Sequence, residues 1–296
     1  MKILLLGKSG QLGWELQRSL APLGELIALG RDNPGGDYTR LDEVRCTVRD
    51  IAPDVIVNAG AHTAVDKAES EPGLARQLNT LAPAMLAAEA QRLGAWMVHY
   101  STDYVFDGSG STPWAETDTV NPLSVYGRTK AESEVAIQQV GCRHLVFRTS
   151  WVYAARGGNF AKTMLRLGKE RDGLTVIDDQ IGAPTGADLL ADVTAHALRI
   201  AWHRPEVAGL YHLVASGETS WYGYASYVLN TARKYGVELK VAPGAIKPVP
   251  TTAFPTPAER PRNSRLNTRK LQTAFGLTLP PWQTGVARML AEILEK

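Results

Sequence analysis

Tyr126 and Lys130 lie four residues apart in residues 125–130 (VYGRTK). In a helix this spacing places both side chains on one face. A free phenol has a pKa of about 10, and lowering it to about 7 takes roughly 4 kcal/mol. An ammonium a few ångströms away supplies energy of that order in a surface-like dielectric. The pair therefore predicts a phenol that exchanges a proton, with Lys130 as its electrostatic partner.

Three glycines near the start of the chain favour this chemical interpretation over an ordinary helix surface. Gly7, Gly10 and Gly13 follow an apolar run and precede a helix-like segment. Glycine at these positions allows a tight turn, lets the backbone approach a pyrophosphate and permits close helix–strand packing. The first N–H groups of the helix attract phosphate. A turn that binds nothing has the same pattern, but the place of this one after the first strand favours a dinucleotide.

Hydroxyl side chains follow the apolar run at 96–100, where Ser101 and Thr102 occur. Ligands of open α/β sheets bind at the carboxyl ends of central strands, so these hydroxyls are expected to hold a substrate carbonyl or its alcohol product. Together with the glycine turn and Tyr126, they predict hydride transfer from a nicotinamide cofactor to a ketone.

The end of the second predicted strand bears on the choice of cofactor. Arg31 and Asp32 occur side by side. An arginine there favours the 2′-phosphate of NADP, whereas an acid favours the ribose hydroxyls of NAD. We expect NADPH, with NADH also accepted. Asp37 and Tyr38 are candidates to border the adenine. His62, beside small residues after the third strand, is a candidate ligand or base, although a single histidine there is more often structural.

Short apolar runs alternate with helix-like segments through the first half of the chain. This alternation indicates right-handed βαβ units and a parallel sheet covered on both faces. We therefore expect an α/β fold with a doubly wound (Rossmann), mostly parallel sheet. Strands are predicted at 2–6, 25–29, 54–58, 96–100, 144–148, 174–177 and 209–214. Helices are predicted at 11–21, 41–51, 72–92, 124–139, 159–171, 188–202, 221–235 and 283–295.

The second half is less regular. Six prolines between residues 242 and 263 argue against a helix or central strand there and predict a loop over the surface or a cleft. We expect a dinucleotide-binding Rossmann domain at 1–150. Residues 151–296 are expected to form a smaller, mixed portion that binds the substrate and partly returns to the Rossmann sheet. Three tryptophans of this half are interpreted as core residues: Trp202, Trp221 and Trp282.

Composition excludes several classes of protein. The 296 residues include 32 basic and 30 acidic side chains, a net charge of +2 that gives no reason to expect nucleic acid or membrane partners. Apolar runs fall far short of the ~20 residues that span a bilayer. The two cysteines, Cys46 and Cys142, form no disulfide framework or zinc motif, so a cytoplasmic location is expected. The sequence is compatible with a homodimer.

The motifs together resemble the extended short-chain dehydrogenase/reductase family, and within it the enzymes that reduce a 4-keto nucleotide sugar. The blocks after the fourth and fifth strands are more telling than the glycine turn. The matching segments run in order over nearly the whole chain: residues 7–13 (GKSGQLG), 58–66 (NAGAHTAVD), 101–106 (STDYVF), 122–127 (PLSVYG) with Lys130, 148–153 (RTSWVY), and Arg260, Pro261 and Ser264.

The resemblance implies that NADPH or NADH reduces the C4 ketone of dTDP-4-dehydro-L-rhamnose, the last step of dTDP-rhamnose synthesis. Tyr126 would donate the proton, Lys130 would position the cofactor and tune the phenol, and Thr102 would assist. Expected cofactor contacts are Gly7, Gly10, Gln11, Leu12, Gly13, Arg31, Asp37, Tyr38, Ala61, His62, Thr63, Tyr100, Tyr126 and Lys130. Expected contacts to the nucleotide sugar are Thr102, Asp103, Tyr104, Trp151 and Arg260.

Two departures and two alternatives accompany this resemblance. Leu6 precedes the first glycine where the family often has threonine, and Lys8 lies inside the turn. Some relatives pair through a divalent metal such as Mg²⁺, but Glu15, the one candidate ligand, is more simply a solvated helix residue. The alternative enzyme is a nucleotide-sugar dehydratase or epimerase of the same fold. The non-catalytic alternative is a regulatory subunit of the same fold, like the β subunit of methionine adenosyltransferase.

Overall fold

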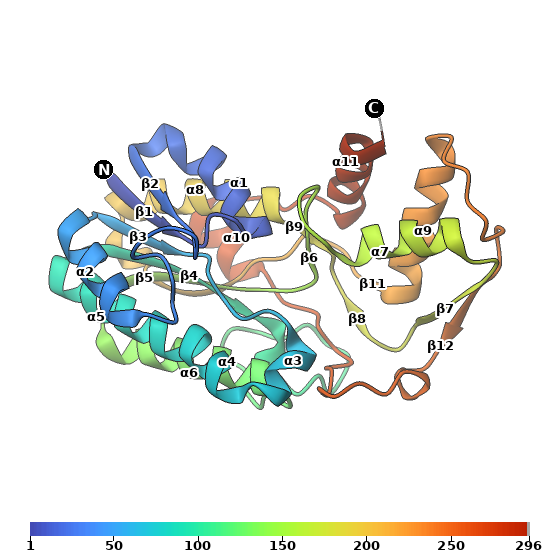
Figure 1. The fold of residues 1–296 in the computed structure, drawn as a ribbon, viewed down its shortest axis with the longest axis horizontal. Coiled ribbons are helices and arrows are strands. Elements are labelled where there is room, and N and C mark those ends of the chain that lie inside the picture. The colour runs from blue at the N-terminus through green and yellow to red at the C-terminus, as the bar shows by residue number, and fades with distance from the viewer. Residues whose placement is uncertain (295–296) are drawn as a thin grey trace.

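The computed structural model describes residues 1–294 and contains a larger α/β body joined to a smaller lobe (Figure 1). The body is built on six parallel strands in the order β10-β5-β4-β3-β1-β2. This confirms the predicted doubly wound, parallel sheet. The strands of the sheet are β1 (Lys2–Leu6), β2 (Glu25–Leu29), β3 (Val55–Asn58), β4 (Trp96–Thr102), β5 (Arg143–Thr149) and β10 (Gly209–His212).

Helices cover both faces of the sheet, which explains why its inner strands are almost wholly apolar and buried. One face carries α1, α8 and α10, which share a hydrophobic cluster with β1 and β4. The other carries α2, α5 and α6. Their bounds are α1 (Gln11–Leu20), α2 (Leu41–Ile51), α5 (Ala82–Leu93), α6 (Val125–Val140), α8 (Ala187–His203) and α10 (Arg269–Phe275).

The helix predicted at 72–92 is interrupted in the structure. It consists of α4 (Pro72–Arg76), a π-helical turn (Gln77–Leu81) and α5. Pro83 explains the interruption, because proline lacks an N–H group and its ring clashes with the carbonyl one turn earlier. The wider π turn relieves this clash. A further short helix that the sequence did not predict, α3 (Val65–Ser70), precedes α4.

The smaller lobe has its own hydrophobic cluster, formed mainly by three helices. These are α7 (Phe160–Glu170), α9 (Trp221–Lys234) and α11 (Trp282–Leu294). The predicted end of the last helix, Glu295, lies outside the described residues. Three two-stranded sheets complete the lobe: β7 (Leu174–Ile177) with β12 (Ile246–Val249), β8 (Ile181–Gly182) with β11 (Thr219–Ser220), and β6 (Val152–Tyr153) with β9 (Thr185–Gly186).

Strand β12 corrects the prediction of an unbroken proline-rich loop at 242–263. It pairs in parallel with β7, and Pro248 lies within it. Proline is tolerated because β12 has a partner on one side only, so the missing N–H breaks no central ladder. The remaining prolines follow the expected irregular path, which runs back from the lobe toward the body (Figure 1).

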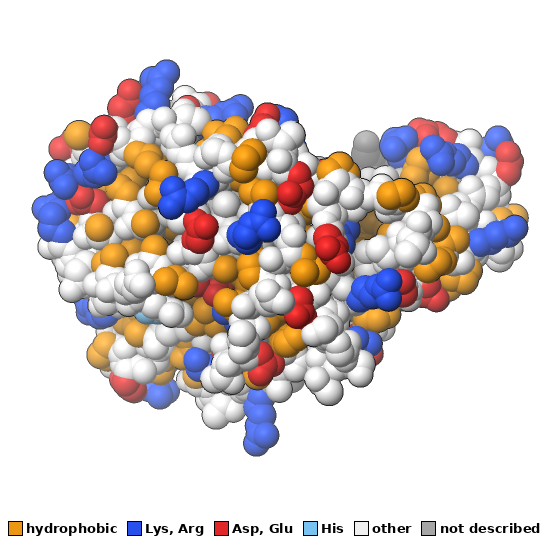
Figure 2. Space-filling view, turned by 90° about the horizontal axis from the view of Figure 1, so that it is seen from below, with side chains coloured by type: hydrophobic (Ala, Val, Ile, Leu, Met, Phe, Trp, Pro, Cys, Tyr) orange, Lys and Arg blue, Asp and Glu red, His pale blue; other side chains and the backbone are white. Residues whose placement is uncertain are grey.

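The surface carries charges of both signs. Figure 2 shows Lys, Arg, Asp and Glu side chains mixed over the face it presents, with a smaller lobe set off from the main body. Within residues 1–294, none of the helices combines the length and apolar character needed to cross a bilayer.

The packing at the glycine turn gives a first prediction. A Cβ atom at Gly13 would lie 2.0 Å from the carbonyl oxygen of Gly7, whereas one at the exposed helical residue Gly73 would meet nothing within 4 Å. Gly13→Ala should therefore lower the free energy of unfolding by roughly 2 kcal/mol or more. Gly73→Ala, the matched control, should leave it equal or raise it by up to about 1 kcal/mol. Urea denaturation measures both, and equal effects would contradict this account of the turn.

Candidate active site

A cavity of about 510 Å³ lies at the carboxyl ends of the central strands. The body supplies the first turn of α1 and the ends of β3, β4 and β5, and the smaller lobe supplies residues that face them. The predicted residues that line it are Gly10, Gln11, Leu12, Ala61, Thr63, Tyr100, Ser101, Thr102, Asp103, Tyr104, Tyr126, Lys130 and Trp151. Residues that were not predicted also line it: Ala59, Val65, Thr149, Ser150, Val152, Gly158 and Trp221.

The glycine turn is shaped by backbone contacts that exclude side chains. Gly7 has φ +92°, and a Cβ atom there would lie 2.5 Å from the backbone nitrogen of Gly60. Gly10 is the N-cap of α1 and contributes no side-chain cap. The first N–H groups of α1 therefore remain available at the cavity, together with the positive end of the helix dipole. This arrangement fits an anionic ligand such as a pyrophosphate.

Tyr126 and Lys130 project from the first turns of α6 into the same cavity. Burial raises the pKa of Tyr126 to about 12, and the nearby Thr102 hydroxyl opposes this rise only in part. The Lys130 Nζ donates to the carbonyl oxygen of Tyr100 at 2.5 Å, and burial lowers the pKa of Lys130 to about 7.

These shifts differ from the simple expectation of an ammonium that lowers the pKa of a neighbouring phenol. Both groups lose hydration, and desolvation disfavours the phenolate and the ammonium alike. In the ligand-free protein, Tyr126 is therefore a firmly protonated phenol and Lys130 an ammonium that gives up its proton easily.

Several buried polar atoms in the cavity wall have no hydrogen-bond partner within the described part of the chain. They are the hydroxyl oxygens of Ser101 and Thr149 and Oδ2 of Asp103. The other carboxylate oxygen of Asp103 accepts from the Thr102 hydroxyl at 2.9 Å, and burial raises the pKa of Asp103 to about 6. Unpaired buried polar groups are costly, so a polar ligand at this wall gains by satisfying them.

Two stacked indoles form the wall on the side of the smaller lobe. The rings of Trp151 and Trp221 are 3.6 Å apart and nearly parallel. Trp151 has φ +49°, a left-handed conformation that is unusual for a bulky residue and is often found at binding sites. Trp221, interpreted as a core residue, does pack against the hydrophobic cluster of the lobe, but it also lines the cavity, which was not predicted. Its sequence pattern does not distinguish it from Trp282, which is buried in the core of the lobe.

The predicted core location of Trp202 is wrong, because its side chain is 39% exposed. Trp202 lies in the last turn of α8, where its neighbour Ala201 is fully buried. An aromatic residue in an amphipathic helix was a reasonable core candidate, but the side chain falls on the solvent face.

Other predicted residues lie outside the cavity wall. Gly7 and Gly13 form the turn behind it. Arg31 is exposed, and Asp37 accepts from the Thr39 N–H at 2.9 Å, a bond that lowers the pKa of Asp37. Tyr38 is buried and donates to Asn58. The backbone of His62 is held by the side chain of Asn79.

Arg260 makes a two-pronged ion pair with Asp66, with distances of 2.9 and 2.8 Å. Asp66 lies in α3, so the pair fastens the proline-rich segment to the body. The guanidinium is therefore already matched by a carboxylate, and its contact with a diphosphate stays a prediction.

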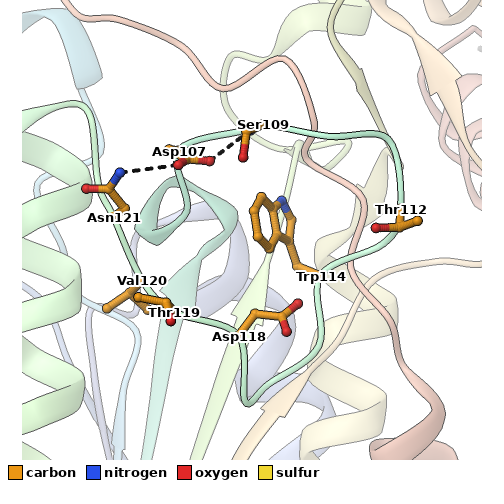
Figure 3. A pocket seen from close by; sticks show the side chains of 8 residues that line it. All are labelled: Asp107, Ser109, Thr112, Trp114, Asp118, Thr119, Val120 and Asn121. Carbon is orange, nitrogen blue, oxygen red and sulfur yellow. Dashed lines mark hydrogen bonds between the residues drawn. The ribbon is translucent and has the colours of Figure 1, made fainter.

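A second cavity, of about 520 Å³, is lined by residues 107–121 (Figure 3). Asp107 there accepts hydrogen bonds from the Ser109 N–H and the Asn121 amide, so its carboxylate is used within the loop itself. None of the predicted site residues lines this cavity. Among residues 1–294 no cluster of three His, Cys, Asp or Glu side chains is arranged to hold a metal ion.

Comparison with known proteins agrees with this geometry. Residues 1–295 match the family model described as RmlD substrate binding domain. The dTDP-4-dehydrorhamnose reductase of Escherichia coli K12 is 60% identical over 295 residues, which covers 99% of this chain and 98% of that protein. The chain belongs to the dTDP-4-dehydrorhamnose reductase family.

Solved structures of this family have the same fold. The Clostridium acetobutylicum protein has a TM-score of 0.89 at 35% identity, and each chain is covered completely. The Bacillus anthracis protein, solved in complex with NADP, has a TM-score of 0.87 at 32% identity, covering 99% of this chain and all of that one. The family resemblance inferred from the sequence motifs is thus confirmed, and with it an oxidoreductase of this family.

The burial of Asp103 leads to a pH prediction. Folding raises its pKa from 3.8 to about 6, so the folded state binds more protons than the unfolded state between these values. This residue therefore reduces stability as the pH rises from about 4 to about 6. Asp103→Asn should raise the free energy of unfolding at pH 7 by on the order of 2 kcal/mol and have little effect at pH 4.

The control for this prediction is Asp107→Asn. Hydrogen bonds from Ser109 lower the pKa of Asp107, so neutralising it should bring no gain at pH 7. Urea titrations at the two pH values measure both variants. The assignment would be contradicted if Asp103→Asn raised the free energy of unfolding by no more at pH 7 than it does at pH 4.

Proposed function

We propose that this chain reduces the C4 ketone of dTDP-4-dehydro-L-rhamnose to dTDP-L-rhamnose with NADPH or NADH, and that Tyr126 donates the proton. The observation that carries the assignment is that the phenol of Tyr126 lines the same cavity as Lys130 and as the hydroxyl of Thr102, at the carboxyl end of β4. The first turn of α1 lines this cavity too, so a proton donor and an anion-binding helix terminus share one site.

The shape and donors of the cavity support a dinucleotide. The free N–H groups at the start of α1 suit the pyrophosphate, and the small residues Ala61 and Thr63 leave room in the loop after β3. Arg31 is exposed beyond β2, where an arginine suits the 2′-phosphate of NADP. Lys130 is the candidate to hold the nicotinamide ribose. The cofactor, when bound, supplies the hydride.

The residues of the chain then handle the proton. The Thr102 hydroxyl donates to Asp103 at 2.9 Å, which holds that hydroxyl at the strand end, and the Tyr126 phenol lines the same cavity. An alkoxide formed at C4 is a much stronger base than a phenolate, because the alcohol it comes from has a pKa near that of bulk water. Proton transfer from a phenol with a pKa of about 12 is therefore downhill. Reduction, the direction proposed, needs the protonated phenol that burial maintains.

The smaller lobe supports a nucleotide-sugar substrate. Trp151 and Trp221 offer a flat aromatic wall that suits the apolar face of a sugar or a base. Asp103 and Tyr104 line the same cavity, as does Ser101, whose hydroxyl has no partner among the described residues. Arg260 is the candidate for the diphosphate, which would compete with Asp66 for the guanidinium. The thymidine base is inferred from the reductases to which the chain is similar.

Replacement of the phenol tests the proposed donor. Tyr126→Phe removes the transferable proton and should reduce kcat by about 100- to 10,000-fold, the usual contribution of general acid catalysis. Tyr211→Phe is the matched control, because Tyr211 is a buried tyrosine whose hydroxyl donates only to the Val207 carbonyl, away from the cavity. NADPH oxidation, followed by nicotinamide absorbance, measures turnover, and quenching of NADPH fluorescence measures binding. A Tyr126→Phe enzyme with full activity would refute the role.

The same assay separates the alternatives. A reductase consumes one reduced nicotinamide for each ketone, whereas a dehydratase or epimerase regenerates its tightly held cofactor. A regulatory subunit would bind NADPH without consuming it. Binding without oxidation of NADPH in the presence of dTDP-4-dehydro-L-rhamnose would therefore overturn the proposed reaction.

A further inference from the structure

A chain of buried polar side chains runs behind Lys130, away from the cavity. It passes from Tyr38 through Asn58 and His99 to Lys130, with Ser133 at its side, and all five are at most 6% exposed. Tyr38 donates to Oδ1 of Asn58 at 2.6 Å, and Nδ2 of Asn58 lies 3.0 Å from Nδ1 of His99. The other ring nitrogen of His99, Nε2, lies 3.1 Å from Nζ of Lys130.

The proton on the His99 ring can be placed from the Asn58 end of this chain. The backbone N–H of Gly60 donates to Oδ1 of Asn58 at 3.2 Å, which fixes the orientation of the amide. The amide NH₂ group therefore faces Nδ1 of His99. Since an NH₂ group only donates, Nδ1 must be the bare, accepting nitrogen.

The contacts of Ser133, on the other side of the His99 ring, lead to the same conclusion. The hydroxyl of Ser133 donates its single proton to the carbonyl oxygen of Lys130 at 2.6 Å. Its oxygen is therefore an acceptor for Nε2 of His99, which lies 3.1 Å away. Neutral His99 thus carries its proton on Nε2, on the side of Lys130. Burial and the charge of Lys130 hold the pKa of His99 well below its usual range, so the ring stays neutral.

An N–H group that faces Nζ affects the two forms of Lys130 in opposite ways. An ammonium has no lone pair and is repelled, whereas a neutral amine can accept the hydrogen bond. We propose that His99 is a positioning residue that favours the neutral amine of Lys130, so that the ammonium acts as a proton store for Tyr126 and not as a permanent charge. The use of that proton rests on the proposed function, whereas the effect on Lys130 does not.

The other charged groups around Lys130 offset this effect only in part. On α6, Glu134 lies one turn further along, but it is held in a buried ion pair with Arg148 of β5 at 2.6 Å. Asp103 lines the same cavity, but the carboxylate oxygen that is hydrogen-bonded accepts from Thr102 and not from Lys130. The lowered pKa of Lys130, caused mainly by burial and opposed by Glu134, agrees with an amine that loses its proton easily.

Replacing the side-chain nitrogen of Asn58 with oxygen should reverse the tautomer of His99. In Asn58→Asp, the carboxylate still accepts from Gly60 and Tyr38 but now also accepts from Nδ1–H of His99. The bare Nε2 then faces Lys130 and accepts from its ammonium. The acid dissociation constant of Lys130 should fall at least about tenfold, a rise of one pKa unit or more.

The added charge is separated from the tautomer by a double-mutant cycle. Asn58→Asp in a His99→Phe background keeps the charge without the imidazole, so the shift there should be much smaller. ¹³C NMR of ε-labelled lysine, assigned with Lys130→Met, follows the titration in the ligand-free protein. Equal shifts in both backgrounds, or no shift in either, would overturn the proposal.

Ser133→Ala provides a small change that folding should tolerate. It removes the competing acceptor, leaves Nε2–H directed at Lys130 alone, and should leave the pKa of Lys130 equal or lower. A rise would contradict the proposed tautomer. The alkaline limb of the kcat profile should move upward with the NMR shift in Asn58→Asp. If the unmodified chain reduced no substrate, the proposed function would fail, but the NMR titration would still decide the role of His99.

Discussion

Desolvation of the first three turns of α6 is the constraint on which the site depends. This helix presents polar side chains to the sheet, and the structure buries Thr129, Lys130, Ser133 and Glu134 almost completely. A buried polar group without a partner costs more than a hydrogen bond returns, so each of the four must be matched. The partners are Asn79 for Thr129, Tyr100 for Lys130, His99 for Ser133 and Arg148 for Glu134. Those partners fix where α6 lies and therefore where Tyr126 points.

The π turn before α5 belongs to the same arrangement. Pro83 prevents a regular helix, and the widened turn carries Asn79, whose amide bonds both the backbone of His62 and the hydroxyl of Thr129. One side chain thus connects the loop after β3, which borders the cavity, to α6, which supplies the phenol and the lysine. A π turn close to a functional site is a common occurrence. Here its cause is a proline, and its effect is to tie two walls of the site together.

The sequence predicted the sheet, the glycine turn and most of the cavity wall, because each depends on local rules. Apolar runs with helical segments between them dictate a parallel sheet, and strand ends in such a sheet converge. What escaped prediction depends on tertiary contacts. Trp221 lines the cavity because α9 packs beside Trp151, and strand β12 forms because β7 offers an edge. The role of the π turn likewise depends on the two distant partners of Asn79. None of these contacts is reflected in the periodic spacing of apolar and polar residues in the sequence.

The direction of the pKa shifts was also beyond local reasoning, and it bears on how the site works. An exposed Tyr–Lys pair would behave as expected from Coulomb attraction, with a more acidic phenol. Burial reverses this: it raises the pKa of Tyr126 to about 12 and lowers that of Lys130 to about 7. A phenol that keeps its proton at neutral pH, beside an amine that exchanges one readily, is matched to giving a proton to an alkoxide and regaining it afterwards. The same burial that makes the site costly to build therefore biases it toward reduction.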